Sequence, residues 1–199
     1  MGPNTRPRRA ARYAGYTLGA IVGGTLGLSS VLGCERTDAS VAAEGRSAPR
    51  GSGLAVEGSE APDFEAVAHS GQRVKLSELR GKNVVLYFYP KDDTPGCTIE
   101  AREIRDEWPR FQQANTVVLG VSADDNESHV RFAEKHGLPF LLLPDPEHEI
   151  AEAYGVPVRL GVTKRVTFVI DATGRVAKTF DDVNPNGHAG EIMKAVTDL

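Results

Sequence analysis

The stretch NVVLYFY at residues 83–89 decides the fold of this chain. It is a continuous run of mostly β-branched and aromatic apolar residues without polar alternation, which predicts a strand buried on both faces of a sheet. Three further runs of this kind lie at 116–122, 140–143 and 165–170. The sequence DATG at 171–174 predicts a turn from the last of these runs into a strand at 175–180, forming an antiparallel hairpin.

Helical patterns separate these runs, at 95–113, 124–136, 147–154 and 190–199. Pro109 is expected to kink or end the first helix, since proline has no N–H and its ring crowds the preceding turn. Asp124 and Glu127 have the spacing of a capping box for the second helix, and Gly137 ends it. Strands that alternate with helices predict an α/β fold with a largely parallel central sheet and helices on both faces. The terminal hairpin makes the sheet mixed.

The composition agrees with one soluble domain and a short appendage. The chain has 199 residues, of which 40% are hydrophobic and 25% charged, with a net charge of −4. This balance offers no basic surplus for binding nucleic acid. Two cysteines are too few for a disulfide-rich mini-fold, so side-chain packing must supply the core.

The first 33 residues differ from the rest in charge. They contain four arginines and no acidic residue, a net charge of +4, which leaves 23 − 4 = 19 basic and 27 acidic residues, a net −8, for 34–199. Residues 14–33 carry no charge. A basic start, an apolar stretch and small residues at its end are typical of a secretory signal peptide. The sequence VLGC at 31–34 resembles a bacterial lipobox, which implies a signal peptide over 1–33 and lipid attachment at Cys34.

These features predict a protein exported and lipid-anchored to the cell membrane on the extracytoplasmic or periplasmic side. One alternative is an uncleaved anchor helix in which Cys34 has no role, and Arg8-Arg9 raises a twin-arginine export signal as another. Residues 34–55 are rich in Ala, Ser, Gly and Arg and lack a periodic apolar pattern. Such a composition predicts a flexible tether, so the folded domain is expected to span 56–199.

Cys97 is a candidate for chemistry because of where it falls. It follows the first buried strand and opens the long helix, and ligand sites in open α/β sheets gather at the carboxyl ends of strands. Thr94 is placed to be the N-cap, and Pro95 suits the first helical turn. A cysteine there faces unpaired backbone N–H groups and the positive end of the helix dipole, which favour thiolate over thiol. The alternative is an inert buried cysteine.

The sequence YFYPKDDTPGCT at 87–98 resembles the peroxidatic loop of peroxiredoxins of the Q-type, or bacterioferritin comigratory, subfamily. The sequence RVTFVID at 165–171 matches the segment with the family's distant active-site arginine. The sequences APDF at 61–64 and LSELRGK at 76–82 resemble segments that open the family domain. The resemblance covers about 56–190 and implies a thioredoxin-like fold, which agrees with the strand–helix alternation.

The resemblance implies a role for several residues. Cys97, as thiolate, would attack a peroxide oxygen and become a sulfenic acid. Arg165 would hold the thiolate and polarise the peroxide, unless it is an ordinary surface arginine. The Thr94 hydroxyl would hydrogen-bond the nucleophile or the peroxide, a role compatible with a plain N-cap. Pro90 would shape the pocket and exclude water from it, with an ordinary strand-end proline as the alternative.

Two further residues have supporting roles. The backbone N–H groups of Gly96 and Cys97 would meet developing negative charge. Glu100 matches an acidic position of the family and would orient Arg165, with an exposed helix-face carboxylate as the alternative.

The chain departs from the subfamily at Arg102, where many members carry a resolving cysteine five residues after the peroxidatic one. Residues 35–199 contain no cysteine besides Cys97. We therefore expect a one-cysteine peroxidase for hydrogen peroxide and organic hydroperoxides, recycled by an external thiol such as a thioredoxin-like protein or a small thiol. Lipid on Cys34 would block its sulfur, whereas unmodified Cys34 on the tether could act as the resolving thiol.

The expected partners are a peroxide, the thiol reductant and the membrane, with no bound cofactor and no nucleic acid, in a monomer or dimer. A structural metal is not expected, since no histidine pairs with Cys or carboxylates at zinc spacing; the histidines are His69, His129, His136, His148 and His188. Other functions considered are a non-enzymatic redox sensor or binding module on the same fold, and a thiol–disulfide exchange protein. The exchange reaction is disfavoured because Cys-x-x-Cys is missing.

Overall fold

The computed structural model describes residues 53–199. The predicted signal peptide, the lipid site at Cys34 and the tether up to residue 52 lie outside the described residues. Leu54 and Ala55 pack against the core, and the Ala55 N–H donates to the Tyr154 carbonyl at 3.0 Å. Packing therefore begins two residues before the predicted domain start at 56.

The domain is a five-stranded mixed sheet with the strand order β5-β4-β3-β8-β9. The strands are β3 (Asn83–Phe88), β4 (Thr116–Ser122), β5 (Leu141–Pro144), β8 (Val166–Ile170) and β9 (Val176–Phe180). β3, β4 and β5 are parallel, whereas β8 is antiparallel to both β3 and β9. The mixed sheet is confirmed, but half of its strand pairs are antiparallel, so "largely parallel" was too strong a prediction.

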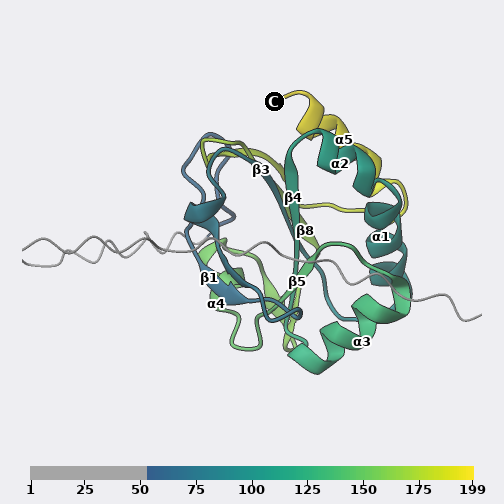
Figure 1. The fold of residues 1–199 in the computed structure, drawn as a ribbon. Helices are drawn as coiled ribbons and strands as arrows, with labels where there is room; N and C mark the ends of the chain where they lie inside the picture. Colours follow the sequence, from purple (N-terminus) through teal and green to yellow (C-terminus); the bar gives the residue numbers. More distant parts are fainter. Residues whose placement is uncertain (1–52) are drawn as a thin grey trace, which may run out of the picture. The chain divides into compact units, whose positions relative to one another are not determined.

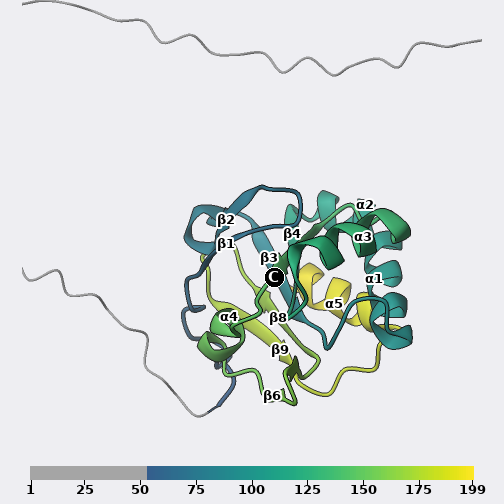
Figure 2. The ribbon, with the colours of Figure 1, turned by 90° about the horizontal axis from the view of Figure 1, so that it is seen from below.

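Helices and small sheets cover the two faces of this sheet (Figures 1 and 2). One face carries α1 (Pro95–Asp106), α2 (Trp108–Gln113), α3 (Asn126–His136) and α5 (His188–Thr197). The other carries α4 (Glu149–Ala153), the hairpin of β1 (Glu65–Val67) and β2 (Arg73–Lys75), and the 3-10 helix η1 (Leu76–Leu79). A second hairpin joins β6 (Val158–Arg159) and β7 (Val162–Thr163). The thioredoxin-like α/β fold is confirmed.

The central strand β3 contributes side chains to the hydrophobic cores on both faces of the sheet, as its unbroken apolar run predicts. Val84, Leu86 and Phe88 point into the core under α4, while Val85 and Tyr87 join the core under α1 and α5. Each such side chain contributes roughly 2 kcal/mol of hydrophobic free energy when it is fully buried. The loop that follows the carboxyl end of β3 therefore leaves a strand that is packed on both faces.

The predicted helix at 95–113 is divided in two. α1 ends before Glu107, which is also the N-cap of α2, and Pro109 is the second residue of α2. Proline is tolerated there because a first-turn N–H has no intrahelical partner. The predicted effect of Pro109 is confirmed, with the break two residues before the ring.

The predicted capping box of α3 is wrong by one residue. The N-cap is Asp125, whose carboxylate accepts a hydrogen bond from the Ser128 N–H at 2.8 Å. Asp124 does not cap because its carboxylate accepts instead from the Ser122 hydroxyl and the Asp92 N–H. The predicted stop at Gly137 is confirmed, with φ 60° in the left-handed region.

Within residues 53–199, no helix has both the length and the apolar character to span a bilayer.

Candidate active site

Cys97 lies in the first turn of α1, two residues after Pro95, on the side of the helix that faces the sheet. Only 2% of its surface is exposed. The N-cap, Thr94, has an extended backbone, and its carbonyl accepts the first helical bond from the Thr98 N–H at 2.9 Å. The backbone N–H groups of Gly96 and Cys97 precede that bond, so they remain available for an anion.

Arg165 reaches Cys97 from the neighbouring strand. It directly precedes β8, and the first residue of β8, Val166, pairs with Phe88 at the carboxyl end of β3. Its Nη2 donates to the Cys97 Sγ at 3.3 Å. The sheet thus brings together two residues that are 68 positions apart in the chain.

Glu100 completes this cluster from the next turn of α1. It is fully buried, and one oxygen, Oε2, accepts a hydrogen bond from Nη1 of Arg165. Burial raises the pKa of Glu100 to about 7, although the Arg165 guanidinium opposes the rise. Burial alone would lower the pKa of Arg165, but the Glu100 carboxylate and Cys97 together raise it. The guanidinium therefore stays charged between two buried acids, with Cys97 on one nitrogen and Glu100 on the other.

Gly96 gives the guanidinium room to lie against α1. A Cβ at this position would lie 3.3 Å from Arg165 Nη2 and 3.5 Å from the Pro185 side chain. Pro185 belongs to the loop between β9 and α5, whose Gly187 N–H donates to the Glu103 carboxylate at 2.8 Å. This loop closes one side of the site, and no local pattern in the sequence pointed to it.

The predicted roles of Thr94 and Pro90 have different geometries. The Thr94 hydroxyl donates to the Lys91 carbonyl at 3.1 Å and makes no side-chain cap. Its oxygen keeps lone pairs for accepting a bond, but in this structure it hydrogen-bonds neither Cys97 nor the helix start. Pro90 is half-buried just after Tyr89, whose carbonyl accepts from the Thr163 hydroxyl at 2.8 Å. No local pattern in the sequence indicated this contact of Thr163.

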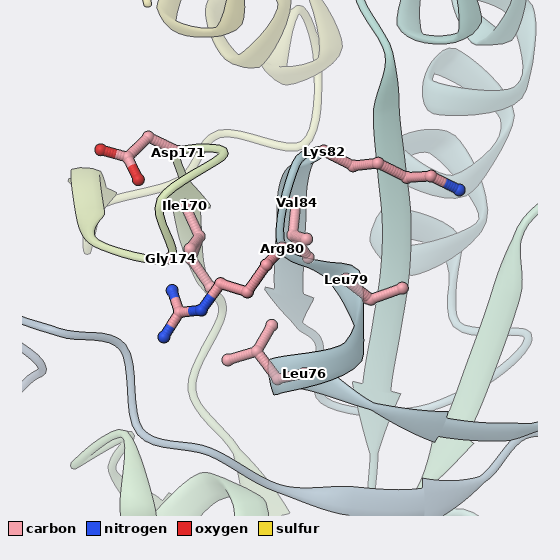
Figure 3. Close-up of a pocket in the computed structure, with 8 residues that line it drawn as sticks. All are labelled: Leu76, Leu79, Arg80, Lys82, Val84, Ile170, Asp171 and Gly174. Atoms are coloured by element: carbon pink, nitrogen blue, oxygen red, sulfur yellow. The ribbon is translucent and has the colours of Figure 1, made fainter.

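A shallow pocket lies at the opposite end of the central strands, where β3 begins (Figure 3). Its lining includes Leu76, Arg80, Val84 and Ile170, and Val84 pairs with Ile170 near the start of β3. Cys97 lies beyond the other end of β3. The pocket therefore belongs to the packing around η1 and is separate from the cysteine site.

No group of three or more His, Cys, Asp or Glu side chains arranged to hold a metal ion occurs among residues 53–199. Three of the five histidines among residues 53–199 do contact carboxylates in the fold, which the zinc-ligand spacing considered above did not indicate. His129 meets Asp92, His136 meets Asp93 and His188 meets Glu191.

The Cys97 sulfur thus lies at the positive end of the helix dipole, with a guanidinium against it. The backbone N–H groups and Arg165 supply positive charge beside the sulfur, where negative charge that develops in a reaction at Cys97 would be stabilised. Residues 58–179 match the model of the AhpC/TSA family, and the chain belongs to this family.

Comparison with known relatives identifies the subfamily within this family. Peroxiredoxin Bcp of Bacillus subtilis (strain 168) is 45% identical over 150 residues, covering 71% of this chain and 95% of the relative. The chloroplastic peroxiredoxin Q of Triticum aestivum is 41% identical over 150 residues, covering 74% of this chain and 69% of the relative. The crystal structure of peroxidoxin BcpB from Mycobacterium tuberculosis superposes with a TM-score of 0.68 at 32% identity, covering 73% of this chain and 98% of that one. The chain is therefore a Q-type peroxiredoxin, a thiol peroxidase.

Proposed function

We propose that this peroxiredoxin reduces hydrogen peroxide and organic hydroperoxides with Cys97 as its peroxidatic residue, and that an external thiol recycles it. The observation that carries the proposal is the buried Cys97 sulfur with Arg165 Nη2 at 3.3 Å, in a domain whose sequence has no second cysteine. Glu100 accepts a hydrogen bond from the Arg165 guanidinium, and Gly96 leaves room for it. In the proposal Pro90 shapes the pocket, and the Thr94 hydroxyl, which here bonds the Lys91 carbonyl and not the sulfur, hydrogen-bonds the peroxide.

The first step consumes the peroxide. The Cys97 thiolate attacks one peroxide oxygen, an S–O bond forms and the O–O bond breaks, which oxidises the sulfur to a sulfenic acid. The departing oxygen leaves as water or alcohol after taking up a proton. Arg165 and the N–H groups of Gly96 and Cys97 stabilise the negative charge as it passes from the sulfur to that oxygen.

The second step needs a thiol from outside the domain. Arg102 stands exposed on α1 at the place where a resolving cysteine would lie. A reductant thiolate attacks the Cys97 sulfenic sulfur, releases water and leaves a mixed disulfide, and a second thiol then frees Cys97. Because Cys97 is buried, the first turn of α1 has to open for a bulky reductant. A thioredoxin-like dithiol or a small thiol meets the chemical requirement.

The location belongs to the proposal as well. The charge pattern of residues 1–33 and the sequence VLGC at 31–34 support export and lipid attachment at Cys34. The enzyme would then remove peroxides at the cell envelope, with residues 35–52 between the anchor and the described domain.

Peroxide consumption by the full chain tests the catalytic part. With a dithiol reductant, the wild type and Cys34→Ala should turn over at similar rates, and Cys97→Ser should be inactive. Activity of Cys97→Ser near the wild-type rate would overturn the assignment. Oxidation of Cys97 that stops after a single turnover with every thiol supplied would favour a redox sensor instead.

A further inference from the structure

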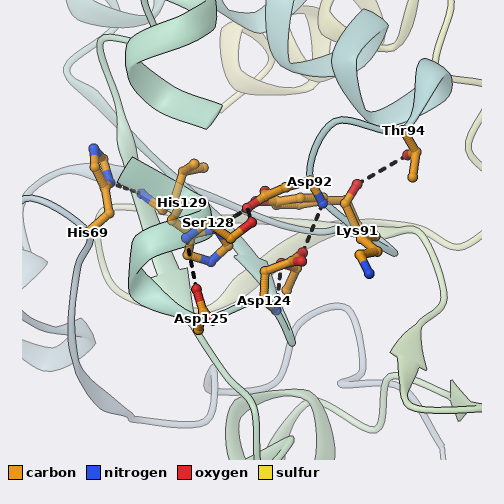
Figure 4. Close-up of polar contacts among 11 residues, drawn as sticks. His69, Lys91, Asp92, Thr94, Asp124, Asp125, Ser128 and His129 are labelled. Atoms are coloured by element: carbon orange, nitrogen blue, oxygen red, sulfur yellow. Dashed lines mark hydrogen bonds and ion pairs between the residues drawn. The ribbon is translucent and has the colours of Figure 1, made fainter. Parts of the chain in front are cut away.

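Another buried polar cluster lies beside the active-site loop, and the proposed chemistry does not use it (Figure 4). At its centre is Asp92, which is 7% exposed and five residues before Cys97. Its partners come from the end of β3, the end of β4 and the first turns of α3. His129, on α3, has no exposed surface.

The Asp92 carboxylate receives three hydrogen bonds. Oδ1 accepts from the Tyr89 hydroxyl at 2.7 Å, and Oδ2 accepts from the Ser128 hydroxyl at 2.8 Å. His129 Nδ1 lies 2.9 Å from Oδ2 and donates to it. Burial alone would raise the pKa of Asp92, but the bonds from His129, Tyr89 and Ser128 bring it below the ordinary value. Asp92 is therefore a buried anion at neutral pH.

The backbone of Asp92 is fixed as well. Its N–H donates to the Asp124 Oδ2 at 2.8 Å, and that oxygen also accepts from the Ser122 hydroxyl at 2.8 Å. The side chain and the main chain of one loop residue are thus both held by β4 and α3. Such a fully bonded buried group resists displacement, because an unpaired buried charge is costly.

The next residue, Asp93, is held far more weakly. It is 43% exposed, with Lys135 Nζ at 2.8 Å and His136 Nε2 at 3.0 Å. Exposed ion pairs of this kind contribute little stability. Asp93 also has φ 56°, a left-handed conformation that non-glycine residues seldom adopt. The loop therefore has one firm attachment, at Asp92, before the turn that carries Cys97.

We propose that Asp92, held by Ser128 and His129, is a positioning residue that fixes the active-site loop and so places the Cys97 sulfur against Arg165. This inference rests on the proposed role of Cys97. The chain from Asp92 to Cys97 contains only the strained Asp93, the N-cap Thr94 and two first-turn residues. A shift at Asp92 is therefore passed directly to the helix start.

An experiment can distinguish positioning of the Cys97 sulfur by Asp92 from an effect of the Asp92 charge on the ionisation of Cys97, because the two act on the rate in opposite directions. A nearby anion disfavours a thiolate, so removing the charge alone would ionise Cys97 at lower pH and speed the peroxide step there. Loss of positioning acts in the opposite direction. It slows the peroxide step even at a pH where the thiol is fully ionised.

The test compares Asp92→Asn with Asp93→Asn in the full chain carrying Cys34→Ser, which leaves Cys97 as the sole thiol. The two variants lose the same charge at adjacent positions, one buried and one exposed. Single-turnover oxidation of Cys97 by hydrogen peroxide is measured across pH, with circular dichroism as the check on folding. We expect the high-pH plateau to fall by about tenfold to hundredfold for Asp92→Asn, since small misplacements of reacting groups have effects of this size. For Asp93→Asn the plateau should stay within about twofold.

An unchanged plateau for a folded Asp92→Asn, or a mere shift of its profile to lower pH, would overturn the proposal. If Asp92→Asn does not fold, Ser128→Ala removes one hydroxyl from the cluster and should still lower the plateau by a few fold. A plateau equal to that of the wild type would overturn the proposal as well.

His129→Ala should have little further effect on the plateau in the Asp92→Asn background, because the effects of residues that act as a unit are not additive. Full additivity would contradict the shared role. Failure of the Cys34→Ser parent itself to react through Cys97 would instead refute the proposed function.

Discussion

At the scale of single residues, Arg165 does the most to define the site, because its two nitrogens separate a thiol from a carboxyl group. Nη2 faces Cys97 and Nη1 faces Glu100, both in a buried setting. A guanidinium can make both bonds at once because its donors are fixed in one plane, whereas a lysine ammonium offers a point charge. The side chains of Cys97, Arg165 and Glu100 therefore form one bridged set, which is the unit that the proposed function uses.

Replacing Arg165 tests this bridge. Arg165→Ala should slow oxidation of Cys97 by peroxide on the order of hundredfold and move the pH–rate profile to higher pH, because the thiolate loses its cation. Arg165→Lys should fall between this variant and the wild type. Stopped-flow measurement of the peroxide step across pH gives both quantities. An unchanged profile in Arg165→Ala would show that Arg165 does not stabilise the thiolate.

The raised pKa of Glu100 predicts that the free energy of unfolding depends on pH. Its pKa rises from 4.5 in the unfolded chain to about 7 in the folded one. Between these values the folded state holds the extra proton, so the free energy of unfolding decreases as the pH rises from 4.5 to 7. The loss amounts to about 3 kcal/mol if the whole shift is expressed.

Glu100→Gln removes this titration and keeps the shape. Denaturant unfolding of both proteins should show the wild type losing stability relative to Glu100→Gln as the pH rises across that window, with a constant difference above and below it. A difference that does not change with pH would mean that Glu100 titrates normally in the folded protein.

At the scale of elements, α3 supports the site through its first turns. Its cap, Asp125, bonds only within the helix, whereas its neighbour Asp124 bonds the active-site loop at the Asp92 N–H. Asp125→Ala should therefore lower the free energy of unfolding by ~1 kcal/mol, and Tm by ~2–4 °C, and leave the peroxide rate unchanged. Asp124→Ala should lower both stability and rate. Thermal unfolding and single-turnover rates of the two variants check this, and equal rate losses would contradict the division of roles.

Local sequence patterns were sufficient to predict the helices and strands near the site. The apolar run of β3, the Pro95 start of α1 and the Gly137 stop of α3 are each decided within a few residues, and each was predicted correctly. The hairpins β1–β2 and β6–β7 were missed because strands of two or three residues are too short for a recognisable alternation. The direction of β8 depends on its pairing with β3, which no local pattern encodes.

The same limit applies to the site. The place of Cys97 between a buried strand and a helix start made it a candidate, with an inert buried cysteine as the alternative that the family resemblance disfavoured. Arg165 was identified only through that resemblance, since 68 residues separate it from Cys97. His129 was considered only as a metal ligand, although it lies 37 residues from Asp92 and bonds it in the fold. Thr94 was predicted to hydrogen-bond the nucleophile or the peroxide. Its hydroxyl donates to the Lys91 carbonyl and does not bond Cys97, and its role toward the peroxide stays a prediction. Contacts between residues on different strands could not be predicted from the sequence, because such a prediction requires knowing the order and direction of the strands in the sheet.

At the scale of the whole molecule, the basic residues 1–33 and the acidic remainder predict different environments for the two ends of the chain. If Cys34 carries lipid, the mature protein should begin at Cys34 and partition into the detergent phase. Cys34→Ala should be recovered unprocessed or in the aqueous phase, because stable membrane attachment needs more than one acyl chain and this variant has none. Intact-mass analysis of the native protein provides the check. A trimmed wild-type protein that starts elsewhere and stays in the aqueous phase would contradict the anchor.

The most direct test of the one-cysteine account is non-reducing intact-mass spectrometry of full-length Cys34→Ser after a stoichiometric dose of hydrogen peroxide. The account predicts a monomer in which Cys97 carries one added oxygen, a sulfenic acid that added small thiols reverse. Excess peroxide should drive it on to the sulfinic state, since no neighbouring thiol condenses with it. Arg102→Cys in the same background should instead yield an intramolecular disulfide. Quantitative formation of a dimer joined through Cys97 in the Cys34→Ser protein would contradict the account, because a second subunit would then resolve the sulfenic acid.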